Sequence, residues 1–234
     1  MLASEIITDV RRELLEPQAG FWTDAELLRH LNRAEKDFVN RTRILEDTAS
    51  LSTTNGVMDY QLPDNWVSAK LVLYNSKEQA SDNDSWNRLT PKSLEKMGQE
   101  EPNFMATETD PDQEANPDRY WIWQNRINLY PAPRNAKDSD LHLYYKSKPI
   151  ALTSTSQNIN IDDSLSEALT AYILWKAWKK SKETSLAEEQ RQLYFEYVGQ
   201  GRRWVSKRSG DQRNKFDIES ATPFGDIDPF RPLT

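Results

Sequence analysis

The chain has 234 residues, which is long enough for one large domain or two small ones. Hydrophobic residues make up 37% of it and charged residues 29%, and the net charge is −7. It has no cysteine and only two histidines, which excludes disulfides and cysteine nucleophiles and disfavours a zinc centre. No run of 18 apolar residues occurs, and the first residues lack a long apolar core, so neither a membrane span nor a secretory signal is expected.

The glycine and tryptophan contents narrow the range of functions further. Seven glycines are few, and no phosphate-binding loop or dinucleotide-binding motif is present. Eight tryptophans are many for an acidic protein of this size. Since aromatic side chains contribute strongly to cores and to protein interfaces, this excess favours an interacting protein.

The first 48 residues show helical periodicity. The spacing predicts a helix over residues 3–15, ended by Pro17, and a second helix that starts after Thr23. Thr23 with Glu26 three residues later has the spacing of a capping box. The second helix then carries one apolar stripe, formed by Leu27, Leu28, Leu31, Ala34, Phe38 and Val39.

Residues 49–150 change to the alternation of strands. The dipeptide Asn55–Gly56 predicts a hairpin, and residues 66–75 read as a strand. Thr90 as cap and Pro91 at the first helical position predict a short helix. Residues 99–118 are expected to form an acidic loop. The runs "RYWIWQ", "RINLYPAP" and "LHLYYKSKP" then predict an antiparallel meander.

Helical periodicity returns at residues 151–208. One helix is expected after a cap at Asp162, Asp163 or Ser164, and another from about Ser185. We therefore expect an α+β fold. A helical bundle would form from residues 1–48 and 151–208, around an inserted antiparallel β-subdomain at 49–150, with an extended C-terminal arm at 209–234.

No catalytic motif is recognisable. His30 lies on a predicted helix and His142 in a predicted strand, and neither belongs to a ligand motif. Carboxylates are abundant, but they match no calcium loop, and paired catalytic carboxylates cannot be found from one sequence. We therefore expect no enzyme activity, no cofactor and no metal, while a carboxylate-dependent glycosidase remains an alternative.

Basic residues cluster near the ends of two predicted helices. The lysines at 176, 179, 180 and 182 suit a solvated helix end. The second cluster is a better candidate for contact with phosphate or an acidic partner, and it consists of Arg202, Arg203, Trp204, Lys207 and Arg208. The alternative is that this cluster is solvated or faces another subunit.

The arm at 209–234 keeps large apolar residues that a disordered tail would normally lack. They are Phe216, Ile218, Phe224, Ile227 and Phe230, spaced by prolines and aspartates. Such spacing suits an extended strap that places single side chains into pockets of a partner. The alternative is that the arm folds back on its own domain.

The order of these features resembles the tailed-bacteriophage head-to-tail connector proteins, also called adaptor or head-completion proteins. The matching phrases include "WTDAELLRHLNRAEKDF", "YQLPDNWVSAKLVLYN", "LTPKSLEKM", "PDRYWIWQNRINLYPAP", "LHLYYKSKPIALT" and "EALTAYILWKAWKK". The resemblance covers most of residues 1–200. It implies a structural protein of the capsid neck, without catalysis, assembled in the host cytoplasm.

The resemblance also implies partners. Such adaptors form a ring, commonly of twelve copies, between the portal protein and a tail or nozzle protein, around a channel that double-stranded DNA crosses. The arm would then bind the portal through its five apolar residues. An acidic channel wall would let the duplex slide, since it repels phosphate. The alternatives are another tail or neck component and a DNA-binding packaging or regulatory protein.

Overall fold

The computed structural model describes residues 1–16, 18–76, 85–102, 104, 116–134 and 137–208. The fold class is α+β, as predicted. The chain divides into two compact units. Met1–Ile44 and the chain from Leu152 onward form a helical unit, and Leu45–Ala151 form a β unit.

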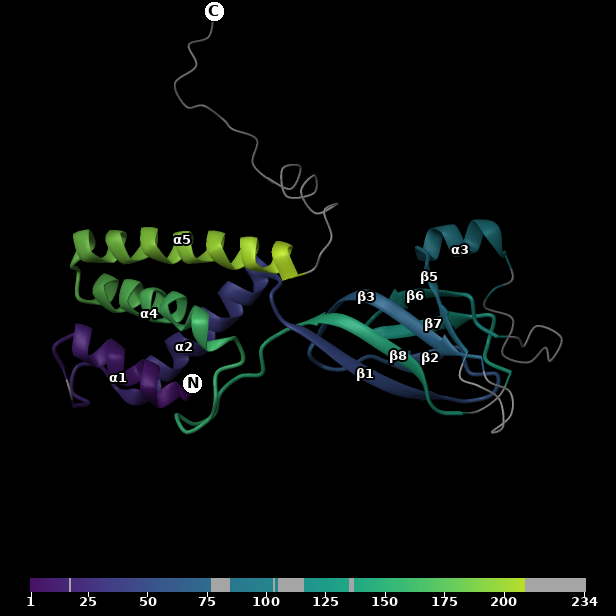
Figure 1. Cartoon of the computed structure of the whole chain (residues 1–234), viewed down its shortest axis with the longest axis horizontal. Coiled ribbons are helices and arrows are strands. Elements are labelled where there is room, and N and C mark those ends of the chain that lie inside the picture. Colours follow the sequence, from purple (N-terminus) through teal and green to yellow (C-terminus); the bar gives the residue numbers. More distant parts are fainter. Residues whose placement is uncertain (17, 77–84, 103, 105–115, 135–136, 209–234) are drawn as a thin grey trace, which may run out of the picture. The chain divides into compact units, whose positions relative to one another are not determined.

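The helical unit contains four α-helices and one 3-10 turn among its described residues (Figure 1). Their bounds are α1 (Ala3–Glu13), α2 (Asp24–Thr42), η3 (Asp163–Leu165), α4 (Ser166–Lys180) and α5 (Thr184–Arg208). Helix α4 packs against each of the other three helices, and α2 also contacts α1 and α5. No helix in the described ranges is both long and apolar enough to cross a membrane.

Helix α2 is capped at Thr23, as predicted. The Thr23 side chain accepts a hydrogen bond from the Glu26 backbone N–H at 3.2 Å, which satisfies one of the free N–H groups of the first turn. The helix ends at Arg43, whose backbone is left-handed, with φ 55°. The predicted apolar stripe is largely buried, with Leu28 only half-buried.

The contacts of α4 and α5 explain why these helices lie close together. Helix α4 buries small and large residues on several sides. The ring of Tyr194 on α5 lies against Phe38 of α2 and against Tyr172 and Trp175 of α4. Gly201 brings α5 close to α2, because a Cβ at this position would lie 2.8 Å from the Phe38 ring.

The β unit contains two sheets with one helix, α3 (Leu94–Glu100). The first sheet has the order β1 (Glu46–Thr53), β8 (Lys137–Ser147), β3 (Trp66–Asn75) and β4 (Trp86–Arg88). The second has the order β2 (Asp59–Gln61), β7 (Arg126–Tyr130), β6 (Arg119–Trp123) and β5 (Thr90–Pro91). The strand pairs are antiparallel, as predicted, except for β5–β6, which is parallel.

One apolar core lies between the two sheets and joins them as a sandwich. It combines Val72 and Tyr74 of β3 and Leu141 of β8 with Ile127 and Leu129 of β7. Successive side chains along a strand point to opposite faces of its sheet, so the residues between these core positions face away from the core. A second, smaller cluster is formed by Met58, Met97, Phe104, Trp121 and Ala132, and it packs α3 against β6.

Two strand predictions were wrong because long-range pairing overrode local signals. The segments on either side of Asn55–Gly56 do not form a hairpin, since β1 pairs with β8 and β2 pairs with β7. The turn instead connects the two sheets. It is held by the Tyr60 hydroxyl, which donates to the Val57 carbonyl at 2.6 Å.

The predicted meander is only partly present. Strands β6 and β7 pair through a turn at Gln124 and Asn125, which both have positive φ, as a tight hairpin requires. Strand β8 leaves this sheet and lies between β1 and β3, so that its apolar residues enter the sandwich core from the opposite side.

Two predicted helix starts also differ from the structure. Thr90 and Pro91 form the edge strand β5, where a proline costs no ladder hydrogen bond, and Ser93 caps α3 instead. Asp162, one of the three expected caps, accepts from the Ser164 N–H and thereby caps η3 ahead of α4.

Candidate interaction surfaces

The predicted basic cluster lies on the last two turns of α5. Arg202, Arg203, Lys207 and Arg208 are exposed, and Trp204 is half-buried. The guanidinium of Arg208 lies over the Trp204 ring at 5.1 Å, a cation–π contact. In the ranges that the structure describes, none of the four cations forms an ion pair.

Arg202 differs from its neighbours because it already has a structural role. Its Nε donates to the Arg41 carbonyl at 3.0 Å, so it satisfies one of the open carbonyls in the last turn of α2. Arg203 and Lys207 have no such contact, which leaves them available to an anionic partner. This surface offers mainly side chains, because the N–H groups of these turns donate within the helix.

The five apolar residues proposed for the arm lie outside the described residues. They are Phe216, Ile218, Phe224, Ile227 and Phe230. Their partner therefore remains a prediction from the sequence.

The two histidines have structural surroundings. His30 is half-buried, its Nδ1 has no hydrogen-bond partner, and burial lowers its pKa below the ordinary value. His142 packs its ring against Trp86 with 4.2 Å between centroids. Across the described ranges, no three His, Asp or Glu side chains lie close enough to hold a metal ion.

Two buried carboxylates were missed by the sequence reasoning, and both hold distant segments together. Glu35 accepts hydrogen bonds from the backbone N–H and the side-chain amide of Asn160 at 2.6 and 2.8 Å, and burial raises its pKa. Asp140 accepts from the Thr53 N–H at 2.9 Å and from the Thr53 hydroxyl. Nothing in the sequence pattern marks these residues as buried, since the partners are over 80 residues away.

The Asp140 carboxylate also influences two tyrosines of the β unit. Burial and the nearby Asp140 charge raise the pKa of Tyr60 and of Tyr74 to about 12, with burial the larger cause in each case. Neither phenol would ionise at physiological pH, so these tyrosines act as packing and hydrogen-bonding groups.

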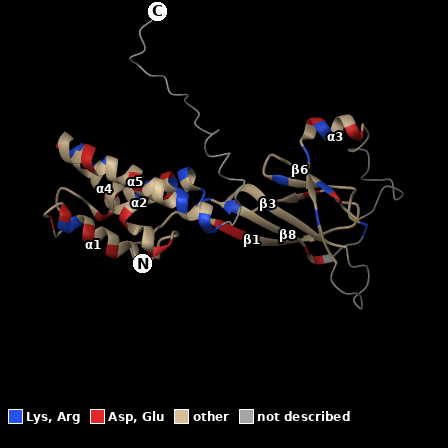
Figure 2. Ribbon diagram, turned by 45° about the horizontal axis from the view of Figure 1, so that its top comes forward, with Lys and Arg blue, Asp and Glu red and all other residues tan. Residues whose placement is uncertain are grey.

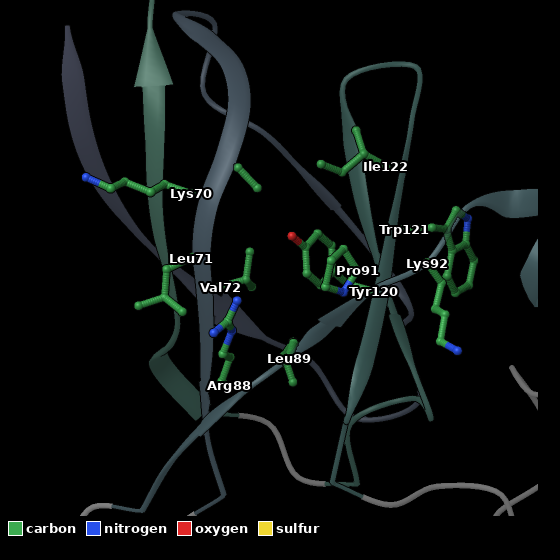
Figure 3. A pocket seen from close by; sticks show the side chains of 11 residues that line it. Lys70, Leu71, Val72, Arg88, Leu89, Pro91, Lys92, Tyr120, Trp121 and Ile122 are labelled. Atoms are coloured by element: carbon green, nitrogen blue, oxygen red, sulfur yellow. The ribbon is translucent and has the colours of Figure 1, made fainter. Parts of the chain in front are cut away.

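A groove in the β unit is a concave surface that the sequence did not predict. Its volume is about 410 Å³, and it lies where one edge of the sandwich is open, between β3 and β6. The segment from Arg88 to Pro91 crosses from one sheet to the other there (Figure 3). Its apolar lining is formed by Ala69, Leu71, Val72, Leu89, Pro91, Tyr120, Trp121 and Ile122.

The two strands that flank this groove, β3 and β6, are paired along only part of the edge that faces it. Strand β3 pairs with β4 only from Leu73 to Asn75, and the Leu89 N–H donates to the Val72 carbonyl at 3.0 Å. Strand β6 pairs with β5 only at its first two residues. Within the described ranges, no strand pairs with residues 67–71 of β3 or residues 121–123 of β6 on this side.

Among the described residues, the groove is lined by three cations and by no carboxylate. Lys70 pairs with Glu46 at 3.0 Å and Lys92 with Glu100 at 2.8 Å, whereas Arg88 has no ion pair among the described residues. The Tyr120 ring reaches from β6 toward β3 (Figure 3), and burial raises its pKa while the nearby Arg88 opposes that effect. The groove therefore combines an apolar floor, free strand edges and one unpaired cation.

Comparison with known proteins adds the evidence on identity. A family profile described as SU10 adaptor protein matches residues 1–215, which is most of the chain. The chain belongs to the SU10 adaptor protein family. No curated protein sequence matches it.

The family membership confirms the resemblance seen in the sequence. This member of the SU10 adaptor protein family is a structural phage adaptor, a class of protein that works with other head and tail components. The matched range ends at residue 215 and so stops just before Phe216. The apolar residues of the arm therefore lie beyond both the match and the described structure.

Proposed function

We propose that this adaptor assembles into a closed ring of twelve copies between the portal and a tail or nozzle protein in the virion neck. The family membership carries the proposal. A closed ring needs two different, complementary faces on each copy. Helix α5 offers spare surface for this purpose, because its 25 residues bury only Ala187, Tyr194, Val198 and Gly201.

The sides of α5 carry the groups that such an interface requires. Leu186 and Phe195 are exposed, and Leu193 and Tyr197 are half-buried. The helices of this unit carry both acidic and basic residues (Figure 2), so opposite charges are available to both neighbours. Apolar contacts between copies would supply the free energy, and charged groups at the rim would set the register.

The ring would surround the DNA without holding it. The chain carries 37 acidic and 30 basic residues, so a channel built from it is net negative and repels phosphate. Arg203 and Lys207 would then contact an acidic partner protein or, transiently, the duplex backbone. A channel lining that is strongly basic in the assembled ring would contradict this part of the proposal.

The arm, residues 209–234, would attach the ring to the portal. Its five apolar side chains are too many for a solvated tail, and proline spacing favours an extended strap. The helical bundle and the β unit would remain folded without it.

Replacing the five apolar arm residues by serine tests this attachment. The variant carries Phe216→Ser, Ile218→Ser, Phe224→Ser, Ile227→Ser and Phe230→Ser. We expect it to co-sediment with purified portal at least about 100-fold more weakly, because each apolar anchor contributes roughly 1 kcal/mol or more. The matched control, Ser220→Ala with Thr222→Ala, should bind as the wild type does. Equal portal binding by the serine variant would refute the strap.

A DNA-binding regulatory role is the second candidate, and the unpaired cations at the end of α5 favour it. The two roles differ in salt dependence. A regulator would bind duplex DNA as a monomer at physiological salt, whereas the adaptor should show no tight binding under those conditions.

A further inference from the structure

The groove between β3 and β6 has the features of a strand-addition site. Strand addition needs an edge with unpaired backbone groups and pockets for alternate side chains. Residues 67–71 and 121–123 provide two such edges in the described structure. The edges lie on either side of apolar groups that belong to the sandwich core, including Val72, Leu89 and Tyr120.

The charge of the groove indicates the chemistry of its occupant. Arg88 is unpaired among the described residues, and no carboxylate lines the groove. In an added strand, successive side chains point to opposite faces. An occupant should therefore alternate apolar residues, which enter the groove, with acidic residues, which face outward within reach of Arg88.

We propose that this groove binds the Phe216–Glu219 segment of the arm of a second copy of this chain. The segment reads "FDIE", so Phe216 and Ile218 alternate with Asp217 and Glu219. Between Phe216 and Phe230 the arm has four acidic residues and no lysine or arginine. Residues 209–222 contain no proline, so nothing in this stretch prevents ladder hydrogen bonds.

The length of the arm permits an exchange between copies. It begins after Arg208, the last residue of α5, and extends to Thr234. The seven residues from 209 to 215 span up to about 24 Å when extended, so Phe216 can lie well away from the end of α5. Exchange of an identical segment between protomers is a common route to association.

This inference goes beyond the proposed function and does not depend on the portal. In the free protein the arm would occupy the groove of a second copy. At the capsid the portal would compete for the same apolar residues. The groove would thus keep the arm ordered and shield Phe216 and Ile218 from water until the portal is present.

Hydrogen exchange of the full-length protein alone tests the groove. We expect those backbone amides of residues 67–71 and 121–123 that point into the groove, away from β8 and β7, to exchange about tenfold more slowly in the wild type than in Arg88→Glu. The variant Asp217→Lys with Glu219→Lys should lose the same protection, and combining it with Arg88→Glu should restore it, because the opposite charges are then exchanged.

Two matched controls separate this effect from a general charge effect. Arg134→Glu changes another exposed arginine of the β unit, and Asp226→Lys with Asp228→Lys changes the other acidic pair of the arm. Both should keep the protection of the two edges. Edge amides that exchange equally fast in the wild type and in Arg88→Glu would overturn the proposal.

A cross-linking experiment identifies the source of the arm. A photoreactive phenylalanine analogue at position 216 is placed in unlabelled protein, which is mixed with ¹⁵N-labelled wild type. We expect cross-links from position 216 to the labelled residues 69–72 or 120–122. Cross-links confined to unlabelled single chains would overturn the assignment to a second copy, and cross-links to other regions only would overturn the groove.

Discussion

Two arginines, Arg11 in the helical unit and Arg88 in the β unit, have opposite surroundings. In the helical unit, Arg11 is buried and donates to the Trp22 carbonyl at 2.8 Å and to Asp24 at 2.6 Å, so it joins α1 to the start of α2. In the β unit, Arg88 lies at an open groove beside two strand edges and has no ion pair in the described ranges. The comparison shows that the first cation stabilises the fold and that the second is free for a partner.

The comparison extends to the backbone. The exposed cations at the end of α5, Arg203 and Lys207, stand on a helix whose N–H groups donate within the helix. The groove offers unpaired strand edges as well as side chains. A partner of this part of α5 would therefore bind mainly to side chains, whereas a partner of the groove can extend a sheet.

The largest expected effect distinguishes the two arginines directly. Arg11→Met should lower the free energy of unfolding by about 3 kcal/mol, because it leaves buried carbonyl groups without a donor. Arg88→Met should change it by less than about 0.5 kcal/mol, as is typical of exposed positions. Urea unfolding measures both. Similar losses for the two variants would contradict the contrast between the units.

The close contact of α5 with α2 allows a second test within the helical unit. Gly201→Ala should destabilise the protein by about 1–2 kcal/mol, because the added Cβ would lie 2.8 Å from the Phe38 ring and 3.0 Å from the Thr42 methyl group. Gly199→Ala meets nothing closer than 3.9 Å and should stabilise α5 by up to about 1 kcal/mol. Thermal unfolding of the pair should give shifts of opposite sign, and shifts of the same sign would show that α5 is not closely packed there.

The smallest expected effect is the contribution of Glu35 to the pH dependence of the free energy of unfolding. Burial raises the pKa of Glu35, so the folded protein holds this proton more tightly than the unfolded chain does. Its contribution to stability is present below about pH 4.5 and is lost as pH rises through the pKa of the folded state.

Glu35→Gln removes this titration. Compared with the wild type, its free energy of unfolding should decline less as pH rises above about 4.5. Urea unfolding from pH 4 to 7 gives the two curves. The exposed replacement Glu189→Gln serves as control and should follow the wild type. Parallel curves for Glu35→Gln and the wild type would show that Glu35 is not responsible.

The sequence predicted those parts of the fold that depend on local interactions. The cap at Thr23, the apolar stripe of α2 and the pairing of the runs "RYWIWQ" and "RINLYPAP" involve residues that are close in the chain, and the structure contains all three. The predicted hairpin at Asn55–Gly56 failed because each flanking segment pairs with a distant strand. Local turn chemistry carries no information about such partners.

The candidate surfaces were predictable to different degrees. The basic cluster at the end of α5 was found because its members are neighbours in the sequence. The groove was missed because its lining comes from four strands, and the absence of a partner for Arg88 depends on their arrangement. The run "LTPKSLEKM" predicted a helix that starts at Pro91, and nothing in it indicated that residues 88–91 cross from one sheet to the other.

The most direct test of the adaptor assignment is the mass and symmetry of the complex that the full-length protein forms with purified portal. Cryo-electron microscopy of that mixture should show a closed ring of adaptor copies on one face of the portal, with the same number of copies in every particle. An adaptor that remains monomeric beside intact portal particles would contradict the account.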